Sequence, residues 1–210
     1  MDLTGPSGEG KSSLLTAFAL LNSYASGIFT LEGHDSSEFT AQQWRQQVAY
    51  LPQKPILTAG SVADALRLPF SLAVRHGIPT PSNDELRAML DQLGCQDVEL
   101  SRTPHDLSGG QAARVCLART LLTKPKLLLA DEADAGLDDA NAELVTTVLA
   151  RIAAETGMAI IRIRHRPSDD RSTRIMRLEH GILSRIDSHG ATNGTSASDI
   201  APVSDMETMQ

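Results

Sequence analysis

Aromatic side chains are scarce in this sequence, since Phe, Trp and Tyr make up only 3% of its 210 residues. Hydrophobic residues as a whole reach 41%, which is enough for a sizeable core. Aliphatic side chains must fill that core, because few large rings are available. The length suits one domain with room for two lobes.

Positive charge is also in short supply, and the formal net charge is −7. That balance argues against a nucleic-acid-binding protein, which usually carries a basic patch. The two cysteines, Cys95 and Cys116, lie far apart in dissimilar contexts and fit no disulfide or metal framework. A reducing cytoplasm is the simplest setting for such a chain.

Long apolar runs are missing as well. No run approaches the roughly 18 residues that a membrane-spanning helix needs. The start of the chain shows no signal peptide pattern, because Asp2 and a glycine-rich stretch occupy its place. Any link to a membrane is therefore expected to come through a partner.

The chain does have a phosphate-loop motif at its start, where Gly5 to Ser12 fit G-x-x-x-x-G-K-[ST] and an apolar helical run, residues 14–21, follows. Glycines let backbone N–H groups point at an anion, and the helix N-terminus adds a partial positive charge. Lys11 is placed for the β- and γ-phosphates, and the Ser12 hydroxyl for Mg²⁺. The alternative is a chance glycine-rich turn. The predicted phosphate-binding residues are Gly5, Pro6, Ser7, Gly8, Glu9, Gly10, Lys11, Ser12 and Ser13.

Strand and helix signals alternate in the next stretch. Residues 27–33 alternate apolar and polar side chains, as a half-exposed strand does, and residues 33–35 turn the chain. Thr40 to Gln43 form a capping box that starts a short helix. Residues 48–51 predict an apolar strand, and Gln53 follows on a loop because prolines on both sides of it stop the strand.

From residue 54 to 118 the pattern is helical. Ser61 can cap a first helix, and a capping box at Ser82 to Glu85 starts a second one. The second helix carries an apolar face, which is expected in the core: Leu86, Met89, Leu90 and Leu93.

A second anion-binding pattern lies in the stretch Leu107-Ser108-Gly109-Gly110-Gln111. Ser108 and Gln111 have capping-box spacing, and the glycines leave the first N–H groups of a helix open to an anion. The alternative is an ordinary capped helix, which is the better interpretation of this stretch taken alone.

Two carboxylates, Asp131 and Glu132, follow the apolar run 127–130. Such a run predicts a strand buried on both faces of a parallel sheet, and ligands bind at the carboxyl ends of those strands. One carboxylate can hold Mg²⁺ through water, and the other can orient or deprotonate an attacking water. The alternative of a solvated strand end is weaker, because a phosphate loop needs such a partner.

An amphipathic helix over residues 144–152, capped by Asp138 or Asp139, comes next. A strand over 158–163 follows, and His165 stands just past its end. A lone histidine in that place is usually polar surface.

The chain ends with a hairpin and a polar segment. Residues 174–178 and 182–186 flank Glu179 to Gly181, which predicts the hairpin. Residues 188–210 are rich in Ser, Thr, Ala, Gly and Asp and contain no aromatic residue, Lys or Arg. This composition predicts a disordered tail.

Taken in order, the phosphate loop, Gln53, residues 107–111, the two carboxylates and His165 resemble the ATP-binding cassette (ABC) ATPases from residue 1 to about 187. The Leu-Ser-Gly-Gly-Gln stretch is the signature of that family and is far more specific than the phosphate loop. Two further stretches resemble the small iron-exporter-type cassettes of bacteria: Trp44-Arg45-Gln46-Gln47-Val48 and Gly60-Ser61-Val62.

The resemblance implies an α/β fold of the P-loop NTPase (RecA-like) type. Its parts are a parallel-sheet core, an inserted α-helical signature subdomain at about 54–118 and a reduced antiparallel β subdomain. It also implies that two copies pack head to tail around two ATP molecules, with each site formed by the phosphate loop of one copy and the signature of the other.

The resemblance assigns a role to each motif. Ser108, Gly109, Gly110 and Gln111 would hold the γ-phosphate of the ATP bound by the facing copy. Asp131, Ser12 and Gln53 would hold Mg²⁺, and Gln53 would also contact the attacking water. Glu132 would be the general base, His165 would contact the γ-phosphate, and Asp138 would couple the two sites. The helical part would dock on a membrane permease, which places the chain on the inner face of the cell membrane.

Three departures from the family pattern stand out. Ala133-Asp134-Ala135-Gly136 replaces the usual Pro-Thr-Ser-Ala, which adds a negative charge near the dimer interface and a flexible glycine. Arg164 precedes His165, where a small or hydroxyl residue is common. Only four residues precede Gly5, whereas the family has several tens that supply strands and an aromatic for adenine. Weaker ATP binding and an exposed sheet edge are the expected consequences.

The sequence therefore predicts an ATP-hydrolysing subunit that drives a separate permease, with export of a metal slightly favoured over import. A soluble cassette acting on ribosomes or DNA is a first alternative, although those usually carry two cassettes or a long coiled-coil insert. A truncated cassette with impaired ATP binding, acting as an interaction module, is a second alternative. Lys11, Asp131 and Glu132 oppose it because all three are intact.

Overall fold

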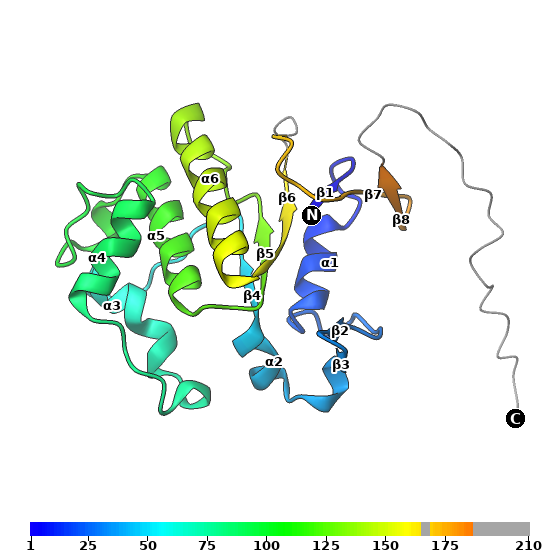
Figure 1. Cartoon of the computed structure of the whole chain (residues 1–210), viewed down its shortest axis with the longest axis horizontal. Helices are drawn as coiled ribbons and strands as arrows, with labels where there is room; N and C mark the ends of the chain where they lie inside the picture. Colours follow the sequence, from blue (N-terminus) through cyan, green and yellow to red (C-terminus); the bar gives the residue numbers. More distant parts are fainter. Residues whose placement is uncertain (165–168, 187–210) are drawn as a thin grey trace, which may run out of the picture.

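The structure, a computed structural model, describes residues 1–164 and 169–186 (Figure 1). The predicted contact of His165 with phosphate and the predicted disordered tail both concern residues outside this part. Both stay predictions. Within the described residues, no helix combines the length and apolar character needed to cross a membrane.

The core of the fold is a six-stranded sheet in the order β4-β5-β6-β1-β7-β8. Neighbouring strands are parallel except for β7 and β8, which form the predicted antiparallel hairpin. The bounds are β1 Asp2–Thr4, β4 Val48–Leu51, β5 Leu127–Asp131, β6 Ala159–Ile163, β7 Ile175–Glu179 and β8 Ile182–Ile186. The short strand β1 therefore lies between two partners, and the edges of the sheet are β4 and the fully exposed β8.

A small second sheet corrects the prediction for residues 27–35. It consists of β2 Thr30–Leu31 and β3 His34–Asp35, which pair antiparallel. The chain turns at Glu32 and Gly33, whose φ angles are 54° and 84°. Two successive positive φ angles suit a two-residue hairpin turn, so the turn comes earlier than the predicted 33–35 and the strands are shorter.

The helices begin where the capping patterns predict. They are α1 Lys11–Phe18, α2 Ala41–Gln47, α3 Val62–Arg67, α4 Asn83–Gln92, α5 Gly109–Leu122 and α6 Asp139–Thr156, with short 3₁₀ segments at Ser36–Glu38, Leu68–Ser71, Ala73–Arg75 and Pro104–Asp106. Thr40, Ser82 and Ser108 each form a complete capping box, and Asp138 caps α6. Helix α1 ends before the predicted Leu21, because Leu20 is left-handed and Trp44 Nε1 donates to the Phe18 carbonyl at 2.7 Å.

Two apolar clusters lie on the two faces of the sheet. One joins α1 and Trp44 to alternate residues of the strands, including Leu3, Leu129 and Ile163. The other joins α3, α4, α5 and α6 to the opposite face. Trp44 is the single buried aromatic among the described residues, so the aliphatic core that the composition predicts is confirmed.

The arrangement of the helices separates α1 from α5. In Figure 1, α3 and α4 gather around α5 at one end of the molecule, and β5 and β6 stand between α5 and α1. The predicted subdomain boundaries at 54 and 118 stay a prediction, although α5 itself continues to Leu122.

Candidate nucleotide-binding site

The phosphate loop runs from the end of β1 to the start of α1, and its glycines are required by the backbone. Gly5 has a φ of 138°, and a Cβ there would lie 2.1 Å from the Leu178 carbonyl oxygen of β7. Gly8 and Gly10 have φ angles of 88° and 90°, which side chains rarely adopt. Gly10 caps α1 without a side-chain bond, so the first N–H groups of α1 face the loop with no side chain satisfying them.

Lys11 is the buried cation of this loop. It is 6% exposed, and its Nζ donates to the carbonyls of Gly5 at 2.8 Å and Pro6 at 2.7 Å. The neighbouring Ser12 is exposed. A loop whose backbone angles require glycine, together with a buried ammonium and an exposed hydroxyl, fits the phosphates and Mg²⁺ of a nucleotide.

Glu9 fixes the loop to the rest of the sheet. Its Oε2 accepts a hydrogen bond from the His180 backbone N–H at 2.6 Å, in the turn between β7 and β8. The sequence predicts Glu9 only as a loop member. No short-range pattern could reveal a partner 171 residues away.

Asp131 ends β5 and is 4% exposed. The Tyr50 hydroxyl of β4 donates to its Oδ2 at 2.9 Å. Burial, and then the hydrogen bond and charge of Asp131, raise the pKa of Tyr50, so the hydroxyl stays a donor. Sequence reasoning missed Tyr50, because its link to Asp131 depends on the pairing of β4 with β5.

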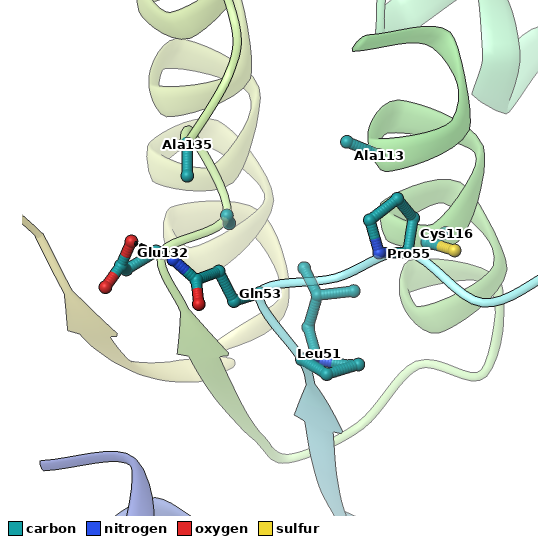
Figure 2. Close-up of a pocket in the computed structure, with 9 residues that line it drawn as sticks. Leu51, Gln53, Pro55, Ala113, Cys116, Glu132 and Ala135 are labelled. Atoms are coloured by element: carbon teal, nitrogen blue, oxygen red, sulfur yellow. Dashed lines mark hydrogen bonds between the residues drawn. The ribbon is translucent and has the colours of Figure 1, made fainter. Parts of the chain in front are cut away.

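Gln53 and Glu132 meet beside Asp131, and Figure 2 shows their side chains pointing toward each other. Gln53 Nε2 donates to Glu132 Oε2 at 2.6 Å. Glu132 follows β5 with a φ of 53°, and its N–H donates to the Ile163 carbonyl at 3.2 Å. A cavity of about 10 Å³, lined also by Cys116 of α5, lies next to the pair. It has room for about one water molecule.

The described residues contain no cluster of three or more His, Cys, Asp and Glu side chains that could hold a metal without help. A donor set of Ser12, Asp131 and Gln53 instead suits Mg²⁺ shared with phosphates, because Mg²⁺ prefers oxygen ligands and keeps several waters.

The signature stretch lies at the start of α5, apart from this site. Ser108 Oγ accepts from the Gln111 N–H at 3.2 Å, and Gln111 Nε2 donates to Asp97 at 2.6 Å. Ser108 and Gly109 are exposed. The side chains of Ser108 and Gln111 bond within this stretch and to Asp97, and α1 and α5 stand apart in Figure 1.

Asp138 caps α6 next to the signature helix. It accepts from the Asn141 N–H at 2.8 Å, and that backbone hydrogen bond is the main cause that lowers its pKa. Asn141 in turn accepts from Arg114 of α5 at 2.6 Å. The loop 132–138 is therefore held between β5 and the signature helix.

The structure changes the expectation for Asp134. The sequence predicts an added negative charge near a dimer interface, but Asp134 is only 7% exposed. Its Oδ2 lies 3.3 Å from Arg164 Nε, so two of the departures from the family pattern pair with each other.

Comparison with known proteins decides the family. The family model described as ABC transporter matches residues 1–135. The chain belongs to the ABC transporter ATPase family.

Two relatives illustrate the range of the match. The ABC cassette is 36% identical to the "Probable iron export ATP-binding protein FetA" of Escherichia coli (strain K12), over 78% of this chain and 71% of that protein. It is 33% identical to the "Lipoprotein-releasing system ATP-binding protein LolD" of Shewanella denitrificans, over 89% of this chain and 82% of that protein. One solved structure, a dimeric post-hydrolysis state of the ATP-binding cassette MJ0796 bound to ADP and Pi, superposes with a TM-score of 0.71. It covers 88% of this chain and 84% of its own at 24% identity, and so supports the predicted fold.

Proposed function

We propose that this ABC ATPase binds MgATP and hydrolyses it to drive transport through a separate membrane permease. The supporting observation is that the phosphate loop, Asp131, Glu132 and Gln53 all lie at the carboxyl ends of the parallel strands β1, β4 and β5 of one sheet, where Gln53 bonds Glu132. Export of a metal is the finer proposal, and it rests on the relative described as an iron export ATP-binding protein.

The residues of the phosphate site have separate tasks in this proposal. Lys11 exchanges its bonds to the Gly5 and Pro6 carbonyls for the β- and γ-phosphates. Ser12, Asp131 and Gln53 would hold Mg²⁺, which would supply positive charge against the charge that develops on the transferred phosphoryl group. Glu132 orients the attacking water and accepts its proton, and Gln53 controls the orientation of Glu132 through their hydrogen bond.

A second copy of the chain completes the site. Ser108 and Gln111 use their backbone N–H groups in the capping box, which leaves those of Gly109 and Gly110 at the start of α5 open to an anion. This stretch stands apart from the phosphate loop of its own chain. A helix N-terminus favours an anion, so the γ-phosphate held by a facing copy is the proposed ligand. This arrangement gives both chains a share in each of two ATP sites, and Asp138 lies in the loop that would couple them.

The permease is proposed to dock in a groove of about 260 Å³ beside the helical part of the chain. Exposed Leu21 and Leu72 line it together with Arg45, Arg75 and Arg119. Burial lowers the pKa of Arg75, whose guanidinium donates to the backbone carbonyls of Gln46 and Thr123. An apolar permease segment that carries a carboxylate complements such a lining. Tyr50 lies in the same groove and bonds Asp131, so docking and the Mg²⁺ site share one side chain.

The Glu132→Gln variant tests the ATPase mechanism. It should bind MgATP without hydrolysing it and accumulate as a dimer at saturating MgATP, as measured by light scattering after size exclusion. The wild type should release phosphate under the same conditions. A Lys11→Ala variant is the control, and it should neither bind ATP nor dimerise. A Glu132→Gln variant that stays monomeric with ATP bound would show that the two-copy mechanism is wrong.

A further inference from the structure

Five charged side chains are buried together on the α6 side of the sheet. Their side chains are at most 11% exposed. They come from β1, from the loop after β5, from β6 and from the segment that follows it: Asp2, Asp134, Arg162, Arg164 and Asp169. Charges this deeply buried need partners, and these have each other.

The contacts form one continuous chain of ion pairs. Arg162 Nε and Nη2 donate to the two carboxylate oxygens of Asp2 at 2.8 and 3.0 Å. The same guanidinium donates to both oxygens of Asp169 at 3.1 Å. Arg164 Nη1 lies 2.6 Å from Asp169 Oδ2 as a charge contact without hydrogen-bond geometry. The Nε of Arg164 then donates to Asp134 at 3.3 Å.

This chain of contacts connects the segments that carry the ATP site. Asp2 begins β1, which leads into the phosphate loop. Asp134 lies in the loop between Glu132 and Asp138, and Arg164 directly precedes His165. A cavity of about 10 Å³ under α6 adjoins the pairs, and Asp134 and Arg164 line it together with Val145 and Leu149 of α6.

Asp134 fixes the loop 132–138 to the segment after β6. The loop folds back on itself, because the Ala135 N–H donates to Glu132 at 2.9 Å and the Leu137 N–H donates to Asp134 at 3.4 Å. Glu132 and Gly136 both have positive φ angles, 53° and 74°. This loop has few long side chains that could fix it. The hydrogen bond that Arg164 donates to Asp134 therefore sets the position of the loop relative to β6.

Stability alone is a poor explanation of this pair. A buried ion pair is often no more stabilising than apolar side chains of the same volume. What an ion pair does provide is a defined distance between two particular segments, since each partner is costly to leave unpaired.

We propose that Asp134 and Arg164 are positioning residues for ATP hydrolysis. Their ion pair holds the loop of Glu132 and Asp138 at a fixed place beside the segment that leads into His165. This inference rests on the proposed function, because it assigns a role within the same reaction. It adds a contact inside one chain that aligns the general base, whereas the signature motif acts across two chains.

The test separates alignment from folding with three variants. Asp134→Asn keeps the shape of the side chain and removes its charge. Arg164→Gln removes the other charge, and the double variant removes both. For each variant, the unfolding midpoint, the kcat of phosphate release and the ATP dissociation constant in the Glu132→Gln background are measured. Asp134→Asn is expected to lower kcat about tenfold or more, since small misplacements of reacting groups are costly, while the ATP dissociation constant changes less than about twofold.

The double variant decides between the two explanations. It should regain most of the unfolding midpoint lost in Arg164→Gln, because that single variant leaves the buried Asp134 carboxylate without its guanidinium, while the kcat of the double variant stays low. Recovery of both the midpoint and kcat would overturn the positioning role, and so would a kcat that Asp134→Asn leaves unchanged. If Asp134→Asn does not fold, Arg164→Gln replaces it, because it loses the same ion pair. A folded Arg164→Gln with low kcat supports the role, and one with full kcat overturns it.

A matched control lies nearby on the surface. Glu143 of α6 pairs with Arg171, and the Glu143 side chain is 60% exposed. Glu143→Gln therefore removes an ion pair without touching the loop, and its kcat should stay within about twofold of the wild type. A wild type that hydrolyses no ATP would overturn the proposed function and the positioning role together. Normal hydrolysis by the wild type and by Asp134→Asn would overturn the positioning role alone.

Discussion

At β1 and β6, the two faces of the central sheet carry different kinds of contact. On the α1 face, Leu3, Leu129 and Ile163 are at most 1% exposed and pack with Leu15 and Trp44. On the α6 face, the corresponding neighbours in β1 and β6 are Asp2 and Arg162, which form a buried ion pair. Leu3 and Asp2 are adjacent in sequence, so one strand contributes to both arrangements.

The difference has a mechanical consequence. Apolar contacts are non-directional and tolerate small shifts. The α1 face therefore stabilises the strand that leads into the phosphate loop through the apolar surface that it buries. Ion pairs join particular atoms, and each is costly when one partner is lost. The α6 face therefore fixes the loops that follow β5 and β6, while the α1 face supplies the bulk of the packing around β1.

Arg162→Gln is expected to have the largest effect of the changes that separate the two faces. It leaves the Asp2 carboxylate buried without its guanidinium, and breaking a buried pair in this way costs about 3–5 kcal/mol of unfolding free energy. Denaturant unfolding measures the loss. Leu129→Ala on the α1 face should cost about 2–5 kcal/mol by leaving a cavity.

Double variants distinguish the two costs. Asp2→Asn added to Arg162→Gln should restore a substantial part of the lost free energy, because Asp169 still has Arg164 nearby. Leu3→Ala added to Leu129→Ala should restore nothing, because it removes more apolar volume from the same cluster. If the Asp2→Asn and Arg162→Gln double variant is no more stable than Arg162→Gln, the lost free energy comes from packing and not from the unpaired charge.

Local patterns made much of this fold predictable. The capping boxes at Thr40, Ser82 and Ser108 span four residues each, and all three helices begin where those patterns place them. The phosphate loop is equally local, since its glycines are required by the backbone angles and by the carbonyl of Leu178. The apolar run ending at Asp131 likewise predicted a strand buried within a parallel sheet.

The remaining contacts depend on strand order, which local patterns do not contain. Arg164 reaches Asp134 because β6 lies beside β5, and Tyr50 reaches Asp131 because β4 lies on the other side. Sequence reasoning noticed Asp134 and Arg164 separately as departures from a pattern. Opposite charges at the ends of two predicted parallel strands were the one signal that could have paired them.

A smaller effect is expected from acid, and on the α6 face it should act through Asp169. Burial opposes the ionised form of Asp169, but hydrogen bonds from Arg162 and from the Arg171 N–H hold its pKa below the usual 3.8. A lowered pKa contributes stability that is complete above 3.8 and is lost as the pH falls through the lowered value. Asp169→Asn should therefore flatten the loss of unfolding free energy below a pH of about 4.

The measurement is denaturant unfolding from a pH of about 6 to about 3. Leu129→Ala is the comparison, since it should lower the whole curve and leave its slope in acid unchanged. If Asp169→Asn and the wild type lose unfolding free energy at the same rate as the pH falls, then exposed carboxylates, and not Asp169, set the acid sensitivity.

The smallest effect is expected at Tyr50, the side chain of the edge strand β4 that bonds Asp131. Tyr50→Phe keeps the ring and removes the hydroxyl that donates to Asp131 Oδ2. The loss of one hydrogen bond should cost about 1 kcal/mol of unfolding free energy. The Mg²⁺ concentration for half-maximal ATP hydrolysis should rise by less than about tenfold, because Tyr50 acts on Mg²⁺ only through Asp131.

Tyr24→Phe is the matched control, because Tyr24 is 98% exposed and loses the same hydroxyl. It should change neither the stability nor the Mg²⁺ requirement. Since Tyr50 also lines the groove proposed for the permease, the two Tyr→Phe variants can be compared with and without membranes that contain the permease. If Tyr50→Phe changes the Mg²⁺ requirement but leaves stimulation by the permease intact, the hydroxyl orients Asp131 and does not transmit docking.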